Sequence, residues 1–310
     1  MAIKAQHITK SFGTFKAVDD LDLYVREGSV HGFLGPNGAG KTTVIRILLG
    51  LLSPDSAEVE ILGKDLFMSR DQIMSQTGAI VEYPAFFEYM TAYENLYYLS
   101  RLSGCADKTM IEKAIDIVGL SKVRNKLVKT FSYGMKQRLG IAQAMIPENK
   151  LIFLDEPVNG LDPHGILDIR NLIRQLSENH GITVFLSSHL LSEVEQTCDY
   201  VTIIHKGHKV CEGKVSELMK QHESIEILTP DRELLKNLFA RENLKIFTEE
   251  DSGEYSRFLI EGSENIVPPL VEKLVNNKIR LYGIAKHQKV LEDIFVELTG
   301  YKKDGGPDRA

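Results

Sequence analysis

The stretch from Gly35 to Thr42 carries a residue pattern that binds phosphate. It reads Gly-Pro-Asn-Gly-Ala-Gly-Lys-Thr and fits G-x-x-x-x-G-K-[ST] with no mismatch. Its glycines let the backbone bend so that successive N–H groups can face a polyphosphate. Lys41 can contact the β- and γ-phosphates, and the Thr42 hydroxyl can bind Mg²⁺. The expected nucleotide-binding residues are Gly35, Pro36, Asn37, Gly38, Ala39, Gly40, Lys41, Thr42 and Thr43.

Both flanks of this loop carry elements that could position it. Residues 30–34 form a short apolar run that predicts a buried strand, and apolar residues recur at helical spacing from Thr43 to Leu52. A helix that begins beside the loop adds affinity for anions. A chance glycine turn would not need this strand and this helix, so we favour the phosphate-binding interpretation.

Two adjacent carboxylates follow a second apolar run, residues 151–154, which predicts another buried strand. A strand end can bring Asp155 beside the phosphate loop, where it would hold Mg²⁺ directly or through water. Side chains alternate along a strand, so Glu156 would point differently and could orient or deprotonate the attacking water. Two acids at a strand end can also merely cap a helix, but the matched loop earlier in the chain favours the chemical roles.

A third stretch, residues 131–138, reads Phe-Ser-Tyr-Gly-Met-Lys-Gln-Arg and opens a predicted helix. Taken alone, Ser132 indicates only a helix N-cap. Together with the other stretches, it resembles the signature motif of ABC-type ATPases, usually Leu-Ser-Gly-Gly-Gln before a basic residue. Other motifs of that family follow in family order. Phe12 matches its adenine-stacking aromatic, residues 159–162 resemble its D-loop, and His189 resembles its switch histidine.

The resemblance covers residues 2–220 and implies an ATP-hydrolysing subunit of an ABC transporter. Its implied fold is α/β: a P-loop ABC-type ATPase domain over residues 1–220, with a RecA-like core, an antiparallel β subdomain and a helical subdomain near residues 84–146. ATP and Mg²⁺ are the implied cofactors. The resemblance assigns Glu156 and His189 to catalysis. It assigns the metal to Thr42, Asp155 and Glu82.

The same resemblance implies that two chains close head to tail around two ATP molecules, either as a homodimer or as a pair with a related ATPase subunit. Each nucleotide would lie between the phosphate loop of one chain and the signature of the other. That signature is Ser132, Tyr133, Gly134 and Met135. Asp162 of the D-loop would communicate across the interface, and His189 would hold the γ-phosphate.

Three departures from the family pattern affect these expectations. Phe131 replaces the usual Leu, a mild change, while Tyr133 and Met135 replace the first signature Gly and the Gln. The retained Gly134 still permits close backbone approach, provided that Tyr133 points away from the phosphate. Glu82 stands where the family normally has Gln. Its carboxylate could bind the metal more tightly or repel the γ-phosphate.

Residues around Glu82 also indicate a subgroup. Ile-Val-Glu before Tyr-Pro-Ala-Phe-Phe, followed by Thr-Ala-Tyr-Glu-Asn-Leu, is similar to bacitracin and lantibiotic exporters. The segment 291–300 is similar to the ends of drug- and polysaccharide-exporting relatives. This implies export of an antimicrobial peptide, a drug or a similar amphiphile. The aromatic stretch 83–90 is the candidate permease contact, although it could instead be core of the helical subdomain.

Composition excludes several other classes of protein. The chain has 310 residues, enough for about two domains. Its net charge of −6 and lack of a basic cluster argue against nucleic acid as a partner. No apolar run approaches the roughly 20 residues that span a bilayer, so the membrane permease must be separate. Three widely spaced cysteines, Cys105, Cys198 and Cys211, favour a reducing cytosol. We expect a cytoplasmic protein, peripheral on the cytoplasmic face of the membrane.

Residues 224–300 predict a second, smaller domain. We expect strands at 225–228, 245–247, 257–260 and 280–282, a helix from Pro230 to Glu242 and two later helices. This β-α-β-β-α-β order is typical of an α+β ferredoxin-like domain. It could steady a dimer, or it could regulate by contacting the partner chain or the permease. Residues 301–310 are expected to be a flexible tail.

Three rival functions use some of the same residues. A soluble ABC-type ATPase of DNA repair or translation would carry coiled coils, zinc clusters or basic arms, which this sequence lacks. A GTPase or small kinase would leave residues 132–138 unexplained. A nucleotide-binding regulator without turnover would not need Glu156 and His189. Phe12, with Phe15, could also pack on its sheet rather than stack on adenine.

Overall fold

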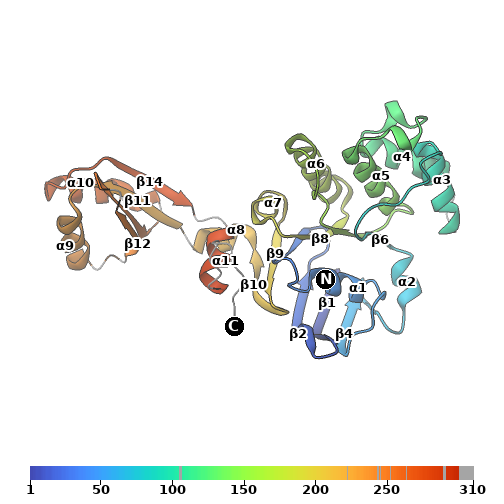
Figure 1. The fold of residues 1–310 in the computed structure, drawn as a ribbon, viewed down its shortest axis with the longest axis horizontal. Helices are drawn as coiled ribbons and strands as arrows, with labels where there is room; N and C mark the ends of the chain where they lie inside the picture. Colours follow the sequence, from blue (N-terminus) through green and yellow to red (C-terminus); the bar gives the residue numbers. More distant parts are fainter. Residues whose placement is uncertain are drawn as a thin grey trace. The chain divides into compact units, whose positions relative to one another are not determined.

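The computed structural model describes residues 1–104, 107–221, 223–242, 244, 246–251, 253–262, 264–288 and 291–299. The chain divides into two compact units, residues 1–215 and a second that begins at Ser216 (Figure 1). Within the described ranges, no helix combines the length and apolar character that a membrane crossing requires. The expected tail, residues 301–310, and Cys105 lie outside these ranges.

An antiparallel sheet of four strands opens the first unit, in the order β2-β1-β4-β5. Its strands are β1 (Ile3–Phe12), β2 (Phe15–Val25), β4 (Ser56–Ile61) and β5 (Lys64–Asp65). Gly13, at φ +60°, turns the chain so that Phe12 pairs with Phe15 across the hairpin. Apolar side chains of these strands pack with α1 into the main core. This sheet is the antiparallel β subdomain that the resemblance implies.

Six strands form the central sheet, in the order β10-β9-β3-β8-β7-β6. They are β3 (Val30–Leu34), β6 (Thr77–Ile80), β7 (Leu151–Asp155), β8 (Thr183–Ser188), β9 (Tyr200–His205) and β10 (His208–Lys214). Only β10 pairs antiparallel; the other pairs are parallel. β3, β7 and β8 are buried along their whole length, because both faces of the sheet are covered.

Helices cover both faces of this sheet. Figure 1 shows α6 (Pro163–His180) and α7 (Leu191–Thr197) on one side, with α1 (Lys41–Leu48) and the antiparallel sheet on the other. A short helix, α2 (Arg70–Met74), precedes β6. In such folds ligands bind at the carboxyl ends of the parallel strands. The loops that follow β3, β7 and β8 therefore form the candidate site.

The expected helical block lies between β6 and β7. It contains α3 (Ala92–Leu102), α4 (Lys108–Ile117) and α5 (Tyr133–Met145), with short 3-10 turns at Ser121–Val123 and Val128–Thr130. The Val128 N–H donates to the Met90 carbonyl at 3.0 Å, so the connection before α5 lies alongside the segment that enters α3. This hydrogen bond links the two ends of the block.

The second unit contains a four-stranded sheet in the order β12-β13-β11-β14, with all neighbours antiparallel. After α8 (Val215–Gln221), its elements are β11 (Glu223–Thr229), α9 (Arg232–Glu242), β12 (Ile246–Asp251), β13 (Ser256–Glu261), a 3-10 turn (Glu264–Ile266), α10 (Val267–Asn276), β14 (Gly283–Gln288) and α11 (Leu291–Thr299). The order interleaves two β-α-β units, as in a split β-α-β sheet. Its own core includes Ile225, Ile227, Phe239, Phe258 and Leu274.

Two expected boundaries in this unit are wrong. The strand expected at 280–282 begins only at Gly283, because the Arg280 N–H and guanidinium bind Asp231 (2.7 and 2.6 Å). The helix expected from Pro230 begins at Arg232. The Thr229 hydroxyl accepts from the Asp231 N–H at 3.0 Å and holds a turn there instead.

Two helices of the first unit also differ from expectation. α1 ends at Leu48 rather than Leu52, because Gly50 at φ +64° turns the chain. Apolar residues at Ile169, Leu172, Ile173 and Leu176 predict a helix only over 168–176, whereas α6 runs from Pro163 to His180. Its signals are a cap on either side: Asp162 accepts from the Gly165 N–H, and Gly181 is left-handed.

Candidate functional site

The loop between β3 and α1 fits only glycine at two positions. A Cβ on Gly35 would lie 2.6 Å from the Ile204 carbonyl oxygen. Gly40 has φ +107°, and a Cβ there would lie 2.6 Å from the Ala17 carbonyl oxygen. The sequence pattern assigned these glycines to phosphate approach. The structure adds that the loop packs tightly against Ile204 within β9 and Ala17 within β2.

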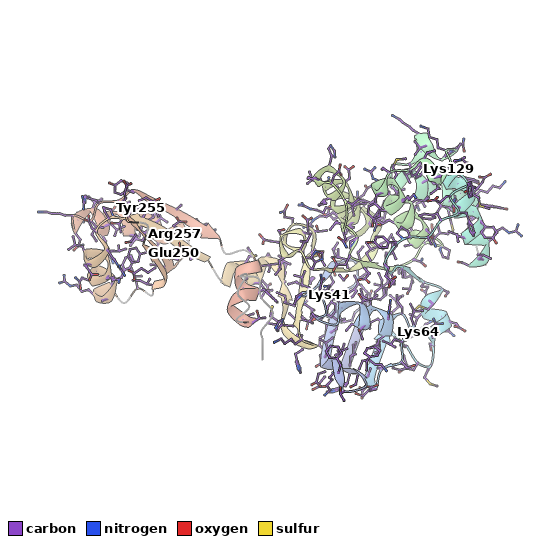
Figure 2. The ribbon with its side chains drawn as sticks, in the orientation of Figure 1. Lys41, Lys64, Lys129, Glu250, Tyr255 and Arg257 are labelled. Carbon is purple, nitrogen blue, oxygen red and sulfur yellow. The ribbon has the colours of Figure 1, made fainter. Side chains whose placement is uncertain are left out.

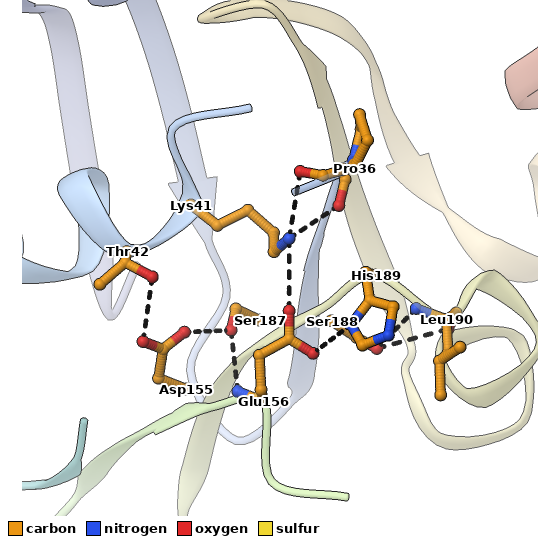
Figure 3. Close-up of polar contacts among 10 residues, drawn as sticks. Pro36, Lys41, Thr42, Asp155, Glu156, Ser187, Ser188, His189 and Leu190 are labelled. Atoms are coloured by element: carbon orange, nitrogen blue, oxygen red, sulfur yellow. Dashed lines mark hydrogen bonds and ion pairs between the residues drawn. The ribbon is translucent and has the colours of Figure 1, made fainter. Parts of the chain in front are cut away.

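Lys41 is folded back into this loop. Its side chain is 6% exposed, and Nζ donates to the carbonyls of Gly35 (2.7 Å) and Pro36 (3.3 Å). The same ammonium lies 3.3 Å from Glu156 Oε1 (Figure 3). Thus the lysine of the loop and the second carboxylate after β7 meet, as their motifs predict for a shared site.

The hydroxyl at the start of α1 meets the first carboxylate. Thr42 Oγ1 donates to Asp155 Oδ2 at 3.1 Å, and Asp155 Oδ1 accepts from Ser187 Oγ at 2.5 Å (Figure 3). Ser187 Oγ also accepts from the Glu156 N–H at 2.9 Å. Sequence reasoning missed Ser187, although a hydroxyl at the end of a buried apolar strand is a usable signal.

These oxygens are chemically suited to a hard cation. Mg²⁺ is usually held by one or two carboxylates with hydroxyl, water and phosphate oxygens, and Thr42 and Asp155 supply that set. Among the described residues, no group of three or more His, Cys, Asp and Glu could hold a metal. A cluster of soft nitrogen or sulfur ligands is therefore absent from the described chain, and the donors present fit Mg²⁺ with a bound nucleotide.

Glu156 also contacts a residue that follows β8. His189, just beyond β8, places Nδ1 at 2.7 Å from Glu156 Oε2, while Lys41 contacts the other oxygen (Figure 3). Glu156 has φ +51°, a conformation that costs energy for a residue with a side chain. The Leu190 N–H donates to Ser188 Oγ at 3.0 Å and fixes the turn that carries His189. Residues from two other motifs therefore converge on the Glu156 carboxylate.

The signature residues lie at the N-terminus of α5. Ser132 caps the helix, and its Oγ accepts from the Met135 N–H at 3.3 Å. The Tyr133 ring packs edge-on to Tyr83, with centroids 6.0 Å apart. Partial burial, with a smaller effect of Tyr83, raises the pKa of the Tyr133 phenol, so it stays neutral. In the described chain, no hydrogen bond or ion pair connects this end of α5 with Lys41 or Glu156.

The N-termini of α5 and α6 share an open cavity of about 630 Å³. Ser132, Gly134 and Asp162 are among its lining residues. A Cβ on Gly134 would lie 3.5 Å from Leu161 Cδ2, an ordinary contact, so packing within the chain does not require a glycine here. Asp162 Oδ1 accepts from the Gly165 N–H at 2.8 Å and caps α6. Two helix N-termini, which favour anions, therefore border a surface hollow.

Phe12 and Glu82 are the remaining expected site residues. The Phe12 side chain is 51% exposed at the hairpin end, with Lys10 Nζ 5.6 Å from its ring centroid. Such a ring is available for stacking, and the adenine role stays a prediction. Glu82 has φ +66°, and its Oε1 accepts from Arg46 Nη2 at 2.6 Å. Arg46, on α1, was not anticipated as a partner. Among the described residues, Glu82 makes no hydrogen bond or ion pair with Thr42 or Asp155.

A mainly parallel sheet with a glycine-rich loop, a buried lysine and two adjacent carboxylates at the end of β7 defines a nucleoside-triphosphate-hydrolysing fold. The family model described as ABC transporter matches residues 18–159. The bacitracin transport ATP-binding protein of Bacillus licheniformis is 41% identical over 303 residues, which cover 96% of this chain and 97% of that protein. The lantibiotic transport ATP-binding protein of Streptococcus pyogenes is 38% identical over 68% of this chain and 90% of its own length.

Solved structures agree with this likeness. An ATP-binding subunit of an ABC transporter matches with a TM-score of 0.62 at 26% identity, covering 71% of this chain and 93% of that one. A nucleotide-free ATP-binding cassette gives 0.64 at 25% identity, covering 71% and 94%. The chain belongs to the ATP-binding subunits of ABC transporters. It binds ATP, and it couples the hydrolysis of this ATP to transport.

Proposed function

We propose that this chain powers the export of an antimicrobial peptide through a separate membrane permease. The relatives named for bacitracin and lantibiotic transport support this substrate class, and the first aligns over 96% of the chain. The observation that carries the hydrolytic part is the Glu156 carboxylate, which lies 3.3 Å from Lys41 and 2.7 Å from His189. We expect the chain to work in the cytoplasm, as a peripheral protein on the cytoplasmic face of the membrane.

The site residues divide the work of hydrolysis. Glu156 orients the attacking water and accepts its proton, while His189 contacts the γ-phosphate. Lys41 contacts the β- and γ-phosphates. These phosphates compete with the Glu156 carboxylate for the Lys41 ammonium. Thr42 and Asp155 would hold Mg²⁺, which neutralises phosphate charge when bound. Binding of ATP would thus free Glu156 from Lys41 for its role as a base.

The signature completes the site from a second chain. Ser132 and the Gly134 backbone lie at the N-terminus of α5, beside an open cavity, and the helix end favours an anion such as the γ-phosphate of a partner-bound ATP. The Tyr133 ring packs edge-on to Tyr83, and Tyr133 is also among the residues that line this cavity. Asp162, at the neighbouring start of α6, would sense the partner site. We therefore propose a homodimer, or a pair with a related ATPase subunit, that closes around two ATP.

The stretch 83–90 is the proposed contact with the permease. The Tyr83 and Tyr89 side chains are 67% and 84% exposed, which disfavours the alternative that they are core of the helical block. Asn95 holds this stretch, because it accepts from the Phe87 N–H (2.8 Å) and donates to the Phe87 carbonyl (3.0 Å). A rigid loop with exposed aromatic rings suits a protein interface.

A reconstituted transport assay tests the proposal. Tagged chain would be purified from membranes together with its permease, placed in vesicles, and supplied with ATP and Mg²⁺. We expect ATP-dependent movement of a peptide antibiotic such as bacitracin, lost in Lys41→Ala while the permease still co-purifies. Absence of a membrane partner, or equal transport by Lys41→Ala, would contradict the proposal.

We also propose that the ATPase domain ends near residue 220 and an accessory domain spans 224–300. The second unit has its own apolar core, which supports separate folding. Its role is either to steady the dimer or to regulate through the partner chain or the permease. Its inclusion in the alignment with the bacitracin transport protein supports a role common to such subunits.

A further inference from the structure

Glu82 and Glu156 occupy matching positions just beyond the ends of the neighbouring strands β6 and β7. β6 and β7 pair in parallel with Ile80 opposite Leu154, and each glutamate comes two residues after its member of this pair. Both have left-handed backbones, with φ +66° for Glu82 and +51° for Glu156. The carboxyl edge of the sheet therefore presents two glutamates in similar conformations. Their partners differ.

Arg46 is the partner that distinguishes Glu82. Its Nη2 lies 2.6 Å from Glu82 Oε1, whereas Glu156 is bound by Lys41 and His189. Arg46 follows Thr42 by four residues on α1, so the two share one helix face. At 1.5 Å per residue, they lie about 6 Å apart along the axis. Glu82 is thus bound by a residue that lies one helical turn along α1 from Thr42, whose hydroxyl contacts Asp155.

We propose that Arg46 is a positioning residue that holds the Glu82 carboxylate away from the Mg²⁺–nucleotide position. This rests on the proposed roles of Thr42 and Asp155. On this proposal the Glu82 carboxylate binds either the Arg46 guanidinium, as the structure has it, or the metal bound with ATP, which is the role expected of Glu82 from the family resemblance. Without Arg46, a third carboxylate would stand unpaired at the edge of the sheet that carries Asp155 and Glu156. Arg46 neutralises it in the nucleotide-free chain and releases it when Mg²⁺ and ATP bind.

The pair is weak enough to exchange. Its side chains are 46% and 62% exposed, and ion pairs this open shift an equilibrium by at most about fivefold. A second arginine–glutamate pair of similar exposure serves as a matched control. Arg124 and Glu112 form a pair at 3.4 Å with side chains 45% and 54% exposed, within the helical block. Loss of that pair should leave the nucleotide site unaffected.

A double-mutant cycle on Mg²⁺-dependent nucleotide binding tests the proposal. A fluorescent, non-hydrolysable ATP analogue at fixed concentration would be titrated with Mg²⁺ for the unmodified chain, Arg46→Met, Glu82→Gln and the double variant. We expect Arg46→Met to lower the Mg²⁺ midpoint by about two- to fivefold, because the freed carboxylate can bind the metal. In the Glu82→Gln background, Arg46→Met should shift nothing. Arg46→Lys, which keeps the cation, should stay near the unmodified midpoint.

Several results would overturn the inference. The first is that Arg46→Met shifts the Mg²⁺ midpoint equally with and without Glu82→Gln, or shifts it in neither background. The others are that Arg46→Met raises the Mg²⁺ midpoint, or that the Arg124→Met control lowers it by a similar factor. Unchanged thermal unfolding of each variant verifies the fold. Lys41→Ala separates this inference from the proposed function. If the unmodified chain binds the analogue no better than Lys41→Ala, the site assignment itself fails; if only the cycle is additive, only the role of Arg46 fails.

Discussion

The Glu156 carboxylate is shared between a lysine ammonium and a histidine ring, and this sharing explains how one residue can be both restrained and reactive. Lys41 contacts one oxygen and His189 the other. The left-handed backbone at Glu156 aims the side chain back over the phosphate loop instead of continuing β7. Because phosphates attract Lys41 more strongly than a single carboxylate can, ATP would release Glu156 for its proposed role as the base.

Replacement of Glu156 by Gln isolates the chemical step. We expect Glu156→Gln to retain ATP binding and to lose about 10²-fold or more in turnover, because the amide cannot accept a proton. Phosphate release measures turnover, and fluorescent-nucleotide titration measures binding. Glu148→Gln, an exposed glutamate paired with Lys113, serves as the control and should keep full activity. Near-normal hydrolysis in Glu156→Gln would remove Glu156 from the base role.

Glu82→Gln restores the residue usual in the family and should keep ATPase activity if the carboxylate is only a variant of the metal shell. Steady-state phosphate release over a range of Mg²⁺ concentrations measures this. Abolished turnover would mean that Glu82 has a catalytic role that none of the contacts described above explains.

At the residue scale, motif spacing predicted the cluster well, and tertiary contacts supplied the rest. The pattern at 35–42 and the acids after residue 154 indicated which side chains would meet. Motif spacing did not indicate Ser187 or Arg46, because single polar residues on β8 and α1 have no fixed spacing from the motifs. Their partners become neighbours only when parallel strands align. For Ser187 the usable signal was a different one, its place at the end of a buried apolar strand.

At the scale of the elements, the signature residues depend on the N-terminus of α5. Ser132 has two separable roles, as the N-cap of α5 and as the proposed contact to a partner-bound phosphate. Asp is as good an N-cap as Ser, but it adds a negative charge. Ser132→Asp should therefore leave thermal stability nearly unchanged, whereas Ser132→Ala should lose about 1 kcal/mol. Denaturant unfolding measures both. Equal destabilisation by the two variants would contradict the cap assignment.

The bounds of a helix or strand followed its local sequence signals only where no distant polar residue bound the same segment. The cap at Asp162 and Gly181 predicts the full length of α6, which apolar periodicity underestimated. The strand expected at 280–282 failed for a tertiary reason, since Arg280 binds Asp231 from the start of α9. Apolar patterns therefore indicated element types, while distant polar partners fixed where several elements begin.

At the scale of the whole molecule, two cores account for two units. The second unit packs its own apolar residues, among them Phe239 and Phe258. Deletion of residues 224–310 should therefore leave nucleotide binding by the first unit intact, within about twofold, because no site residue lies beyond His189. Fluorescent-nucleotide titration of the truncated chain checks this. Loss of binding would mean that the proposed domain boundary is wrong.

The central claim is that one chain holds half of each ATP site and a second copy supplies the rest. Light scattering of Glu156→Gln with ATP and Mg²⁺ tests it most directly. We expect the particle mass to double with nucleotide, and to stay that of one chain when Ser132→Asp is added, although that double variant still binds the fluorescent analogue. A mass that doubles equally with Ser132→Asp, or that never doubles with bound ATP, would contradict completion of the site by a partner's signature.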